Sequence, residues 1–169
     1  MTTQTLGTHE QRDDGTHVLR YERRLAHPVD RVWHAVTEPS EVEGWWAEAD
    51  IDLRVGGRVQ FRWLNTDRKD DVKATGTVVR LDPPWLVEYD TDHHGLLRFE
   101  LSPDGDAATV LRFTVEREGD EKLDLVLPGW HVHLEHLDAA LDGDPIAWET
   151  WEADHRPRWD ELHAAYAEG

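Results

Sequence analysis

Six short segments, five of alternating apolar and polar residues and one rich in β-branched residues, follow one another between residues 51 and 115, and they constrain the fold of this chain most strongly. Alternation with a period of two residues is typical of strands that bury one face. Gly and Pro turns separate the segments, so the pattern predicts consecutive antiparallel strands. The predicted strands span residues 51–55, 58–64, 73–81, 85–90, 97–101 and 109–115.

A seventh strand and two short helices are predicted before this run. The strand lies at residues 17–26, where apolar side chains again alternate with charged ones. Pro28 suits a first helical position, and a second short helix after Pro39 would carry Trp45 and Trp46. The first helix has apolar residues at helical spacing, namely Val29, Val32, Trp33 and Val36.

The longest helical pattern comes last. After Pro128-Gly129, apolar residues recur at helical spacing up to Gly143, a residue suited to end a helix. A further turn or helix is indicated after Pro157. The tryptophans Trp148, Trp151 and Trp159 are expected to pack within the chain, although they could also cover the cavity end or form a dimer contact.

This order of elements predicts an α+β fold of the helix-grip type. A curved antiparallel sheet of about six to seven strands would wrap around the C-terminal helix, and the space between them is a natural cavity. Residues 1–16 contain a single large apolar side chain, Leu6, and are expected to be a flexible tail. Residues 17–168 are expected to form a single domain.

The composition narrows the classes of partner. Eighteen Lys and Arg residues against 36 Asp and Glu residues give a formal net charge of −18, which repels phosphate backbones and anionic lipids. We therefore expect neither nucleic acid nor a membrane as a partner. The chain has no cysteine and no long apolar segment, so we expect a cytoplasmic protein without disulfides or thiolate chemistry.

Four stretches of the chain resemble a known family in their order and spacing. They are RVWHAVTEPSEVEGWW at residues 31–46, IDLRVGGRVQFRW at residues 51–63, Gly76 with Pro83-Pro84, and GWHVHLEHLDAALDG at residues 129–143. They look like successive blocks of the Activator of Hsp90 ATPase homologue 1-like family, in the SRPBCC, START and Bet v 1 superfamily. The resemblance extends over about residues 17–152.

The resemblance implies a hydrophobic ligand pocket within a helix-grip fold. Relatives include lipid and hormone binders, polyketide cyclases, aromatases and self-sacrificing resistance proteins, so the fold alone does not define a function. Eukaryotic Hsp90 activators carry an additional N-terminal domain that residues 1–16 cannot supply, so Hsp90 is not expected as a partner. Residues 116–127 differ from the shorter, more polar loop of relatives, which leaves the entrance and local shape of the cavity open.

Aromatic and apolar side chains on the predicted sheet and last helix are the candidate ligand contacts. Large aromatic residues dominate ordinary cores, so each one alone is better explained by packing, yet as a group some must face the cavity. The candidates are Trp45, Trp46, Phe61, Trp63, Tyr89, Phe99, Phe113, Trp130, His133, Leu134 and Leu137.

The histidines raise the question of metal binding. His131, His133 and His136 form an HxHxxH pattern, but two helical residues that are two positions apart point about 200° apart, and no recognisable zinc signature is completed. His93 and His94 end a predicted strand. We expect no metal and no cofactor, and the sequence has no serine-hydrolase elbow, phosphate-binding loop or dinucleotide fingerprint.

The predicted function is binding of a small hydrophobic ligand, whether aromatic, polyketide-like or lipid, between the sheet and the C-terminal helix. One alternative is a cofactor-free cyclase, dehydratase or hydrolase, which would need polar groups converging around His133, such as Tyr89, Arg98 or Glu100. The alternation places Arg98 and Glu100 on the outer face, which counts against them. Another alternative is a protein-interaction or stress-response module with exposed tail tryptophans. Catalytic residues and ligand identity stay open.

Overall fold

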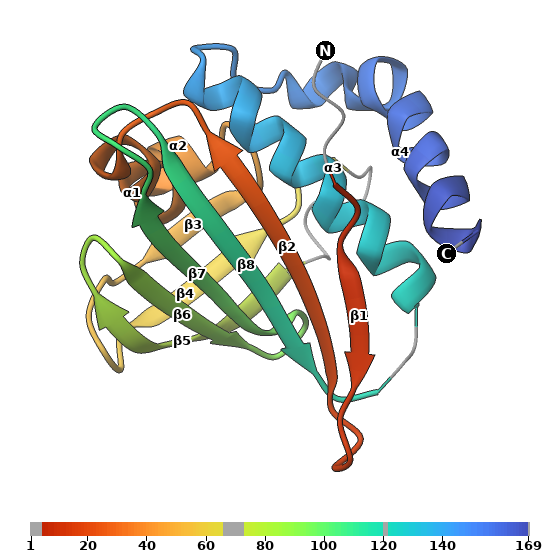
Figure 1. Ribbon diagram of the computed structural model, residues 1–169, viewed down its shortest axis with the longest axis horizontal. Coiled ribbons are helices and arrows are strands. Elements are labelled where there is room, and N and C mark those ends of the chain that lie inside the picture. The colour runs from red at the N-terminus through yellow and green to blue at the C-terminus, as the bar shows by residue number, and fades with distance from the viewer. Residues whose placement is uncertain (1–4, 66–72, 120–121, 169) are drawn as a thin grey trace.

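The computed structural model describes residues 5–65, 73–119 and 122–168, and these form an α+β fold (Figure 1). Within them, eight antiparallel strands form one open sheet in the order β1-β2-β8-β7-β6-β5-β4-β3. The strands are β1 (Thr8–Gln11), β2 (His17–Leu25), β3 (Glu48–Ile51), β4 (Arg58–Arg62), β5 (Lys73–Asp82), β6 (Leu86–Thr91), β7 (Gly95–Pro103) and β8 (Thr109–Arg117). The helices are α1 (Val29–Thr37), α2 (Pro39–Val42), α3 (Leu123–Leu141) and α4 (Trp151–Glu168), with a 3-10 turn at Trp148–Thr150.

The predicted helix-grip fold is confirmed, with α3 lying along one face of the curved sheet (Figure 1). Apolar residues on that face are buried at the alternating positions that the sequence indicates. Tyr21 and Phe113 are cross-strand partners on β2 and β8, and Phe99 faces Phe113 from β7. These aromatic pairs pack the inner faces of β2, β8 and β7 together in one core beneath the helix.

The edge strand β1 differs from the expectation of a flexible tail for residues 1–16. Thr8–Gln11 pair antiparallel with β2, from Thr8 opposite Arg20 to Gln11 opposite His17. The four side chains of β1 are polar and exposed, so the strand leaves no alternating apolar pattern in the sequence. Backbone hydrogen bonds to the neighbouring strand hold it, and these are not encoded by side-chain hydrophobicity.

Two short helices between β2 and β3 are confirmed, and they lie together at one end of the sheet (Figure 1). Buried polar groups attach them to the core and to each other. The Tyr89 hydroxyl donates a hydrogen bond of 2.9 Å to the carbonyl of Val36, and the Trp45 indole donates one of 2.7 Å to the carbonyl of Ala35. Both aromatic rings are fully buried.

Helix α3 begins six residues before the predicted boundary. Pro128 was expected to precede the helix but lies inside it, where it removes one helical hydrogen bond. The apolar side chains of Leu123, Val126 and Leu127 pack against the core and extend the buried stripe towards the N-terminus. This burial offsets the missing bond, so tertiary packing overrides the local proline signal.

Helix α4 packs on the side of α3 that faces away from the sheet (Figure 1). Trp151 and Leu162 are buried against Val132 of α3, with Trp148 and Trp159 partly buried beside them. The expected packing of the tail tryptophans within the chain is confirmed, which removes the exposed patch on which the protein-interaction alternative depended. In the ranges that the structure describes, none of the helices is both long and apolar enough to cross a membrane.

Candidate ligand-binding site

An apolar cavity of about 180 Å³ lies between the sheet and the N-terminal half of α3. The ends of several strands reach it, together with the β6–β7 turn and the first three turns of α3. Its position matches the predicted space between sheet and helix. The residues that line it are Trp46, Trp63, His93, His94, Arg117, Lys122, Leu125, Val126, Gly129, Trp130 and His133.

Three tryptophans from separate parts of the chain form the aromatic wall. Trp46 follows α2, Trp63 follows β4 and Trp130 lies on α3. Trp46 is stacked on Phe61 of the sheet at 4.1 Å between ring centroids and meets Trp130 edge-on at 5.4 Å. Because Phe61 supports it from behind, the Trp46 ring presents a fixed face to the cavity.

His94 lies on the tight turn that joins β6 to β7. Gly95 makes this turn with a φ of 80°, and an added Cβ there would lie 2.4 Å from the carbonyl oxygen of Glu116. The ring of His94 lies between Trp63 and Trp130, at centroid distances of 4.6 and 5.1 Å. Burial holds its pKa well below the ordinary value of 6.5, so the ring is neutral at neutral pH.

His133 reaches the cavity from the third turn of α3. Its Nδ1 lies 2.7 Å from the carbonyl oxygen of Gly129, and a carbonyl only accepts hydrogen bonds. The neutral ring must therefore carry its proton on Nδ1, which leaves the lone pair on Nε2. Burial lowers the pKa of His133 to about 4, so this neutral tautomer is the form present at neutral pH.

Two cationic side chains complete the lining. Arg117 ends β8, and Lys122 is the residue before α3. Lys122 adopts a left-handed conformation with a φ of 63°, the sole non-glycine residue with positive φ in the described ranges. A left-handed backbone conformation costs free energy for a residue other than glycine. Lys122, in the segment that departs from the family pattern, is therefore held in an unusual backbone geometry beside the cavity.

The structure brings together four of the predicted ligand contacts and leaves the others in the core. Trp46, Trp63, Trp130 and His133 line the cavity. The remaining candidates are fully or almost fully buried against one another, away from the cavity lining: Trp45, Phe61, Tyr89, Phe99, Phe113, Leu134 and Leu137. For these seven, core packing explains their burial without a ligand.

Seven lining residues were not among the predicted contacts. His93 and His94 were noticed only as metal candidates, and Arg117 and Lys122 lie in the segment where the family resemblance fails. That departure was the one signal that could have pointed to them. The other three are Leu125 and Val126, in the part of α3 that precedes the predicted helix, and Gly129, at the predicted start of that helix.

The other buried histidines on α3 face helix α4. Trp151 donates an indole hydrogen bond of 3.0 Å to His136 Nε2, and His131 Nδ1 lies 2.8 Å from the Tyr166 hydroxyl. Burial lowers the pKa of His131 to about 4 and that of His136 to about 2. Among the described residues, no group of three or more potential metal ligands converges.

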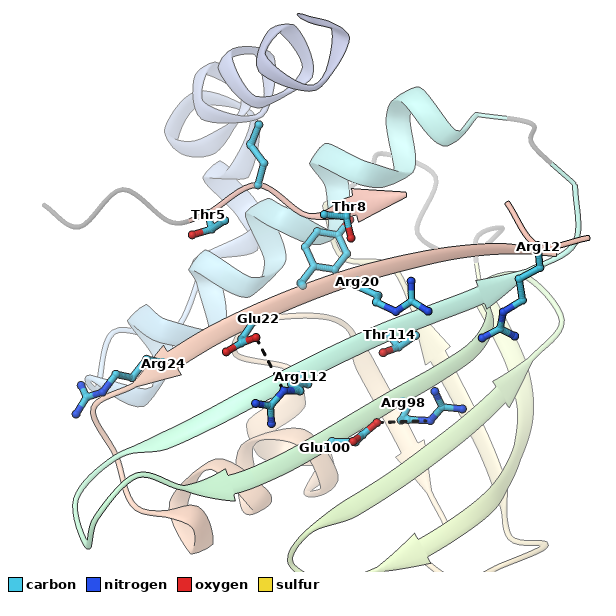
Figure 2. A pocket seen from close by; sticks show the side chains of 12 residues that line it. Thr5, Thr8, Arg12, Arg20, Glu22, Arg24, Arg98, Glu100, Arg112 and Thr114 are labelled. Atoms are coloured by element: carbon cyan, nitrogen blue, oxygen red, sulfur yellow. Dashed lines mark ion pairs between the residues drawn. The ribbon is translucent and has the colours of Figure 1, made fainter. Parts of the chain in front are cut away.

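A larger hollow of about 690 Å³ lies on the outer face of the sheet and is unsuited to an apolar ligand (Figure 2). Arginines line it, and carboxylates neutralise them, as in the pair of Arg24 and Asp104 at 2.7 Å and the pair of Arg98 and Glu88 at 2.7 Å. Figure 2 shows Arg98 and Glu100 together on this face, as the alternation predicts. Neither lines the inner cavity, so neither is available to act beside His133.

Comparisons with known proteins agree with this fold. Residues 26–142 match the family described as Activator of Hsp90 ATPase homolog 1-like protein. CalU16 from Micromonospora echinospora is 24% identical, with a TM-score of 0.70 over 98% of this chain and 96% of CalU16. A conserved protein of unknown function from Enterococcus faecalis, EF2215, is 19% identical, with a TM-score of 0.76 over 96% of this chain and 88% of that protein.

A third solved structure is DynU16, described as a protein of the dynemicin biosynthetic locus. It is 21% identical, with a TM-score of 0.62 over 76% of this chain and 48% of DynU16. A comparison with curated proteins found no match. The family match covers more than half of the chain and includes the two short helices, most of the sheet and α3. The chain therefore belongs to the Activator of Hsp90 ATPase homolog 1-like family.

Proposed function

We propose that this protein binds a small hydrophobic ligand, aromatic in part, in the cavity between the sheet and α3. The observation that carries the proposal is the convergence of three tryptophan rings, from three separate parts of the chain, on one half-open concave space. Flat indole faces favour flat apolar ligands, and concave apolar sites with few polar groups are the usual place for small-molecule binding.

The size of the cavity limits the part of a ligand that it encloses. An engineered cavity of about 150 Å³ binds benzene, and the cavity here, about 180 Å³, is of similar size. One or two fused rings therefore fit, while a larger polyketide-like or lipid molecule would insert only one end. The origin of DynU16 in a biosynthetic locus supports a ligand from natural-product chemistry.

The formal net charge of −18 supports a role away from nucleic acids and anionic membrane surfaces. We propose that the protein acts in the cytoplasm as a binding protein. Its partner would be the small molecule itself.

The first test is native mass spectrometry of the protein purified from its own cells, followed by thermal-shift screening of aromatic, lipid and polyketide-like compounds. A co-purifying apolar molecule, or stabilisation that saturates with ligand concentration, is the expected result. Failure of every compound to stabilise the protein, with no co-purifying mass, would overturn the proposal.

A cofactor-free enzyme is the second candidate, and one observation favours it. Two neutral histidines, the partly buried His94 and the buried His133, line the same apolar cavity, and His133 has an unprotonated Nε2. Such a group can accept a proton in an aldol-type cyclisation or a dehydration. A pKa of about 4 makes His133 a weak base, however, so binding is the better-supported role.

The variant His133→Asn separates the two roles. The Asn amide can keep the hydrogen bond to the carbonyl of Gly129, while the basic Nε2 is lost. If the protein is an enzyme, turnover of a bound substrate should fall at least about a hundredfold with little change in affinity. Unchanged turnover would exclude His133 as the base.

A further inference from the structure

One polar group in the cavity lining has a fixed hydrogen-bonding role. His133 donates from Nδ1 to the carbonyl oxygen of Gly129 at 2.7 Å, and that bond occupies the single proton of the neutral ring. Its other nitrogen, Nε2, carries a lone pair and can only accept. No described residue donates to Nε2. The ring is 8% exposed and lines the cavity, so Nε2 is its one polar atom left to meet a ligand.

His94 contributes a second ring nitrogen without a partner. Its Nε2 is buried, and within the described ranges it forms no hydrogen bond. A buried polar nitrogen of this kind costs free energy, which a polar atom of a ligand can recover. Burial, and to a lesser degree the nearby His93 and His133, keep the pKa of His94 well below its ordinary value. His94 and His133 are therefore neutral neighbours in the lining of one cavity.

The lone pair of His133 restricts which ligand atom can face it. A carboxylate, ketone or ether oxygen has no proton to donate and would leave Nε2 unpaired, whereas an indole N–H can donate but not accept. An aromatic hydroxyl can donate to His133 and also accept from His94 Nε2, in the tautomer that carries the proton there. With a pKa of about 10, such a hydroxyl stays neutral at neutral pH, so no charge is buried.

The aromatic wall places a ring within reach of this acceptor. Trp130 and His133 lie three residues apart on α3, and their ring centroids are 6.1 Å apart. Trp46 meets Trp130 edge-on at 5.4 Å and continues the wall. A ligand ring packed on Trp130 can therefore present a substituent to His133 without leaving a cavity of about 180 Å³.

We infer that the ligand is a hydroxylated aromatic compound of one or two rings, whose hydroxyl donates its proton to Nε2 of His133. This inference rests on the proposed function and specifies its ligand class. The tryptophan rings hold the aromatic body of the ligand, and the histidine selects the hydroxyl. A methyl ether of the same ring system would occupy the same wall but leave Nε2 without a donor.

The test compares hydroxyl compounds with their methyl ethers: phenol with anisole, and 2-naphthol with 2-methoxynaphthalene. The ether is the more apolar member of each pair, so burial of apolar surface alone favours the ether. NMR titration at neutral pH measures the affinities for the wild-type protein, His133→Asn and His34→Asn. The Asn amide at position 133 can keep the bond to Gly129, while Nε2 is lost. His34 is an exposed histidine on α1 outside the cavity lining, so His34→Asn is the matched control.

A second measurement needs no variant. The ¹⁵N resonance of His133 Nε2 is recorded in the wild-type protein, free and saturated with each compound. Accepting a proton changes the shielding of a lone-pair nitrogen, so this resonance should move with the hydroxyl compounds and far less with the ethers. Circular dichroism checks that the variants fold, and the wild-type resonance decides the question if His133→Asn does not.

The hydroxyl compound of at least one pair should bind the wild-type protein at least about fivefold more tightly than its ether. His133→Asn should bring the two affinities to within about twofold of each other, and His34→Asn should keep the preference. Such a loss of affinity is small beside the roughly hundredfold loss of turnover expected of a catalytic base.

Three results would count against the inference. Ethers that bind as tightly as the hydroxyl compounds in both pairs would overturn the hydroxyl class and leave the apolar site intact. A hydroxyl preference that survives His133→Asn, with an unmoved Nε2 resonance in the wild type, would overturn His133 as the acceptor. Absence of binding by all four compounds would overturn the proposed function as well.

Discussion

The hydroxyl of Tyr166 lies 2.8 Å from Nδ1 of His131 and also accepts the backbone N–H of Gly7 at 2.7 Å. The hydroxyl can donate its own proton to His131 Nδ1 when that nitrogen is unprotonated. Arg23 approaches the same ring nitrogen at 3.5 Å, which agrees with an acceptor at Nδ1. One hydroxyl thus connects the N-terminal segment, α3 and α4.

Tyr166→Phe should lower the free energy of unfolding by about 1–3 kcal/mol, because it leaves the Gly7 N–H without a partner and the His131 nitrogen with only the 3.5 Å contact to Arg23. Urea denaturation followed by tryptophan fluorescence measures the change. Thr150→Ala, which removes an exposed hydroxyl bonded to Asp154, serves as a control with an effect near zero. Equal unfolding midpoints for Tyr166→Phe and the wild type would contradict this role.

Because α3 buries neutral histidines, we predict that the free energy of unfolding of the protein falls in mild acid. The pKa values of His131 and His133 are lowered to about 4 and that of His136 to about 2, against 6.5 in the unfolded chain. The unfolded state therefore binds more protons below about pH 6.5, and the free energy of unfolding falls as the pH decreases from there. At pH 5 the loss is about 2 kcal/mol for each fully buried histidine.

Urea unfolding at neutral pH, pH 6 and pH 5 tests this dependence. The slope should be shallower in His133→Asn than in the wild type, because one titrating group is removed. Thr150→Ala, the exposed control used above, removes no titrating group and should keep the wild-type slope. A free energy of unfolding that stays constant between neutral pH and pH 5 would refute the assignment of neutral buried rings.

Filling the cavity should affect ligand binding more than stability. Val126 is half-buried and lines the cavity, so Val126→Trp should weaken binding at least about tenfold and cost about 1 kcal/mol or less in stability. Val79→Trp, on β5 and outside the lining, is the matched control and should keep full affinity. Thermal-shift titration measures both; equal affinities for the two variants would place the ligand elsewhere.

Gly95 should be intolerant of any side chain. It has a positive φ of 80°, and a Cβ would lie 2.4 Å from the Glu116 carbonyl oxygen, so Gly95→Ala should cost about 2–4 kcal/mol and displace His94. Gly105 also has a positive φ, of 74°, but open space around it, so Gly105→Ala should cost only about 1 kcal/mol. The difference in unfolding free energy isolates the steric clash, and equal losses would show that no clash exists.

Local patterns in the sequence predicted much of the fold. The strands β2 and β4–β8, the two helices after β2 and the family all follow from alternation, helical spacing and motif order, because these depend on neighbouring residues. Strand β3 was predicted three to four residues too late, and β1 was missed because its polar side chains show no period. The start of α3 was predicted too late because Pro128 was read as a helix boundary. In the structure, packing against residues distant in the chain outweighs the one hydrogen bond that Pro128 removes.

The sequence by itself determined which aromatic residues would lie on the inner face of the sheet and the buried stripe of α3, because side-chain direction follows from backbone period. It did not separate Trp46 and Trp130, which line the cavity, from Phe99 and Leu134, which fill the core. Only the tertiary structure decided that, by bringing the β6–β7 turn, the end of β8 and the first turns of α3 together. The β6–β7 turn is distant in the chain from α3, and the space between them depends on how the helix packs on the sheet, which no local sequence pattern determines.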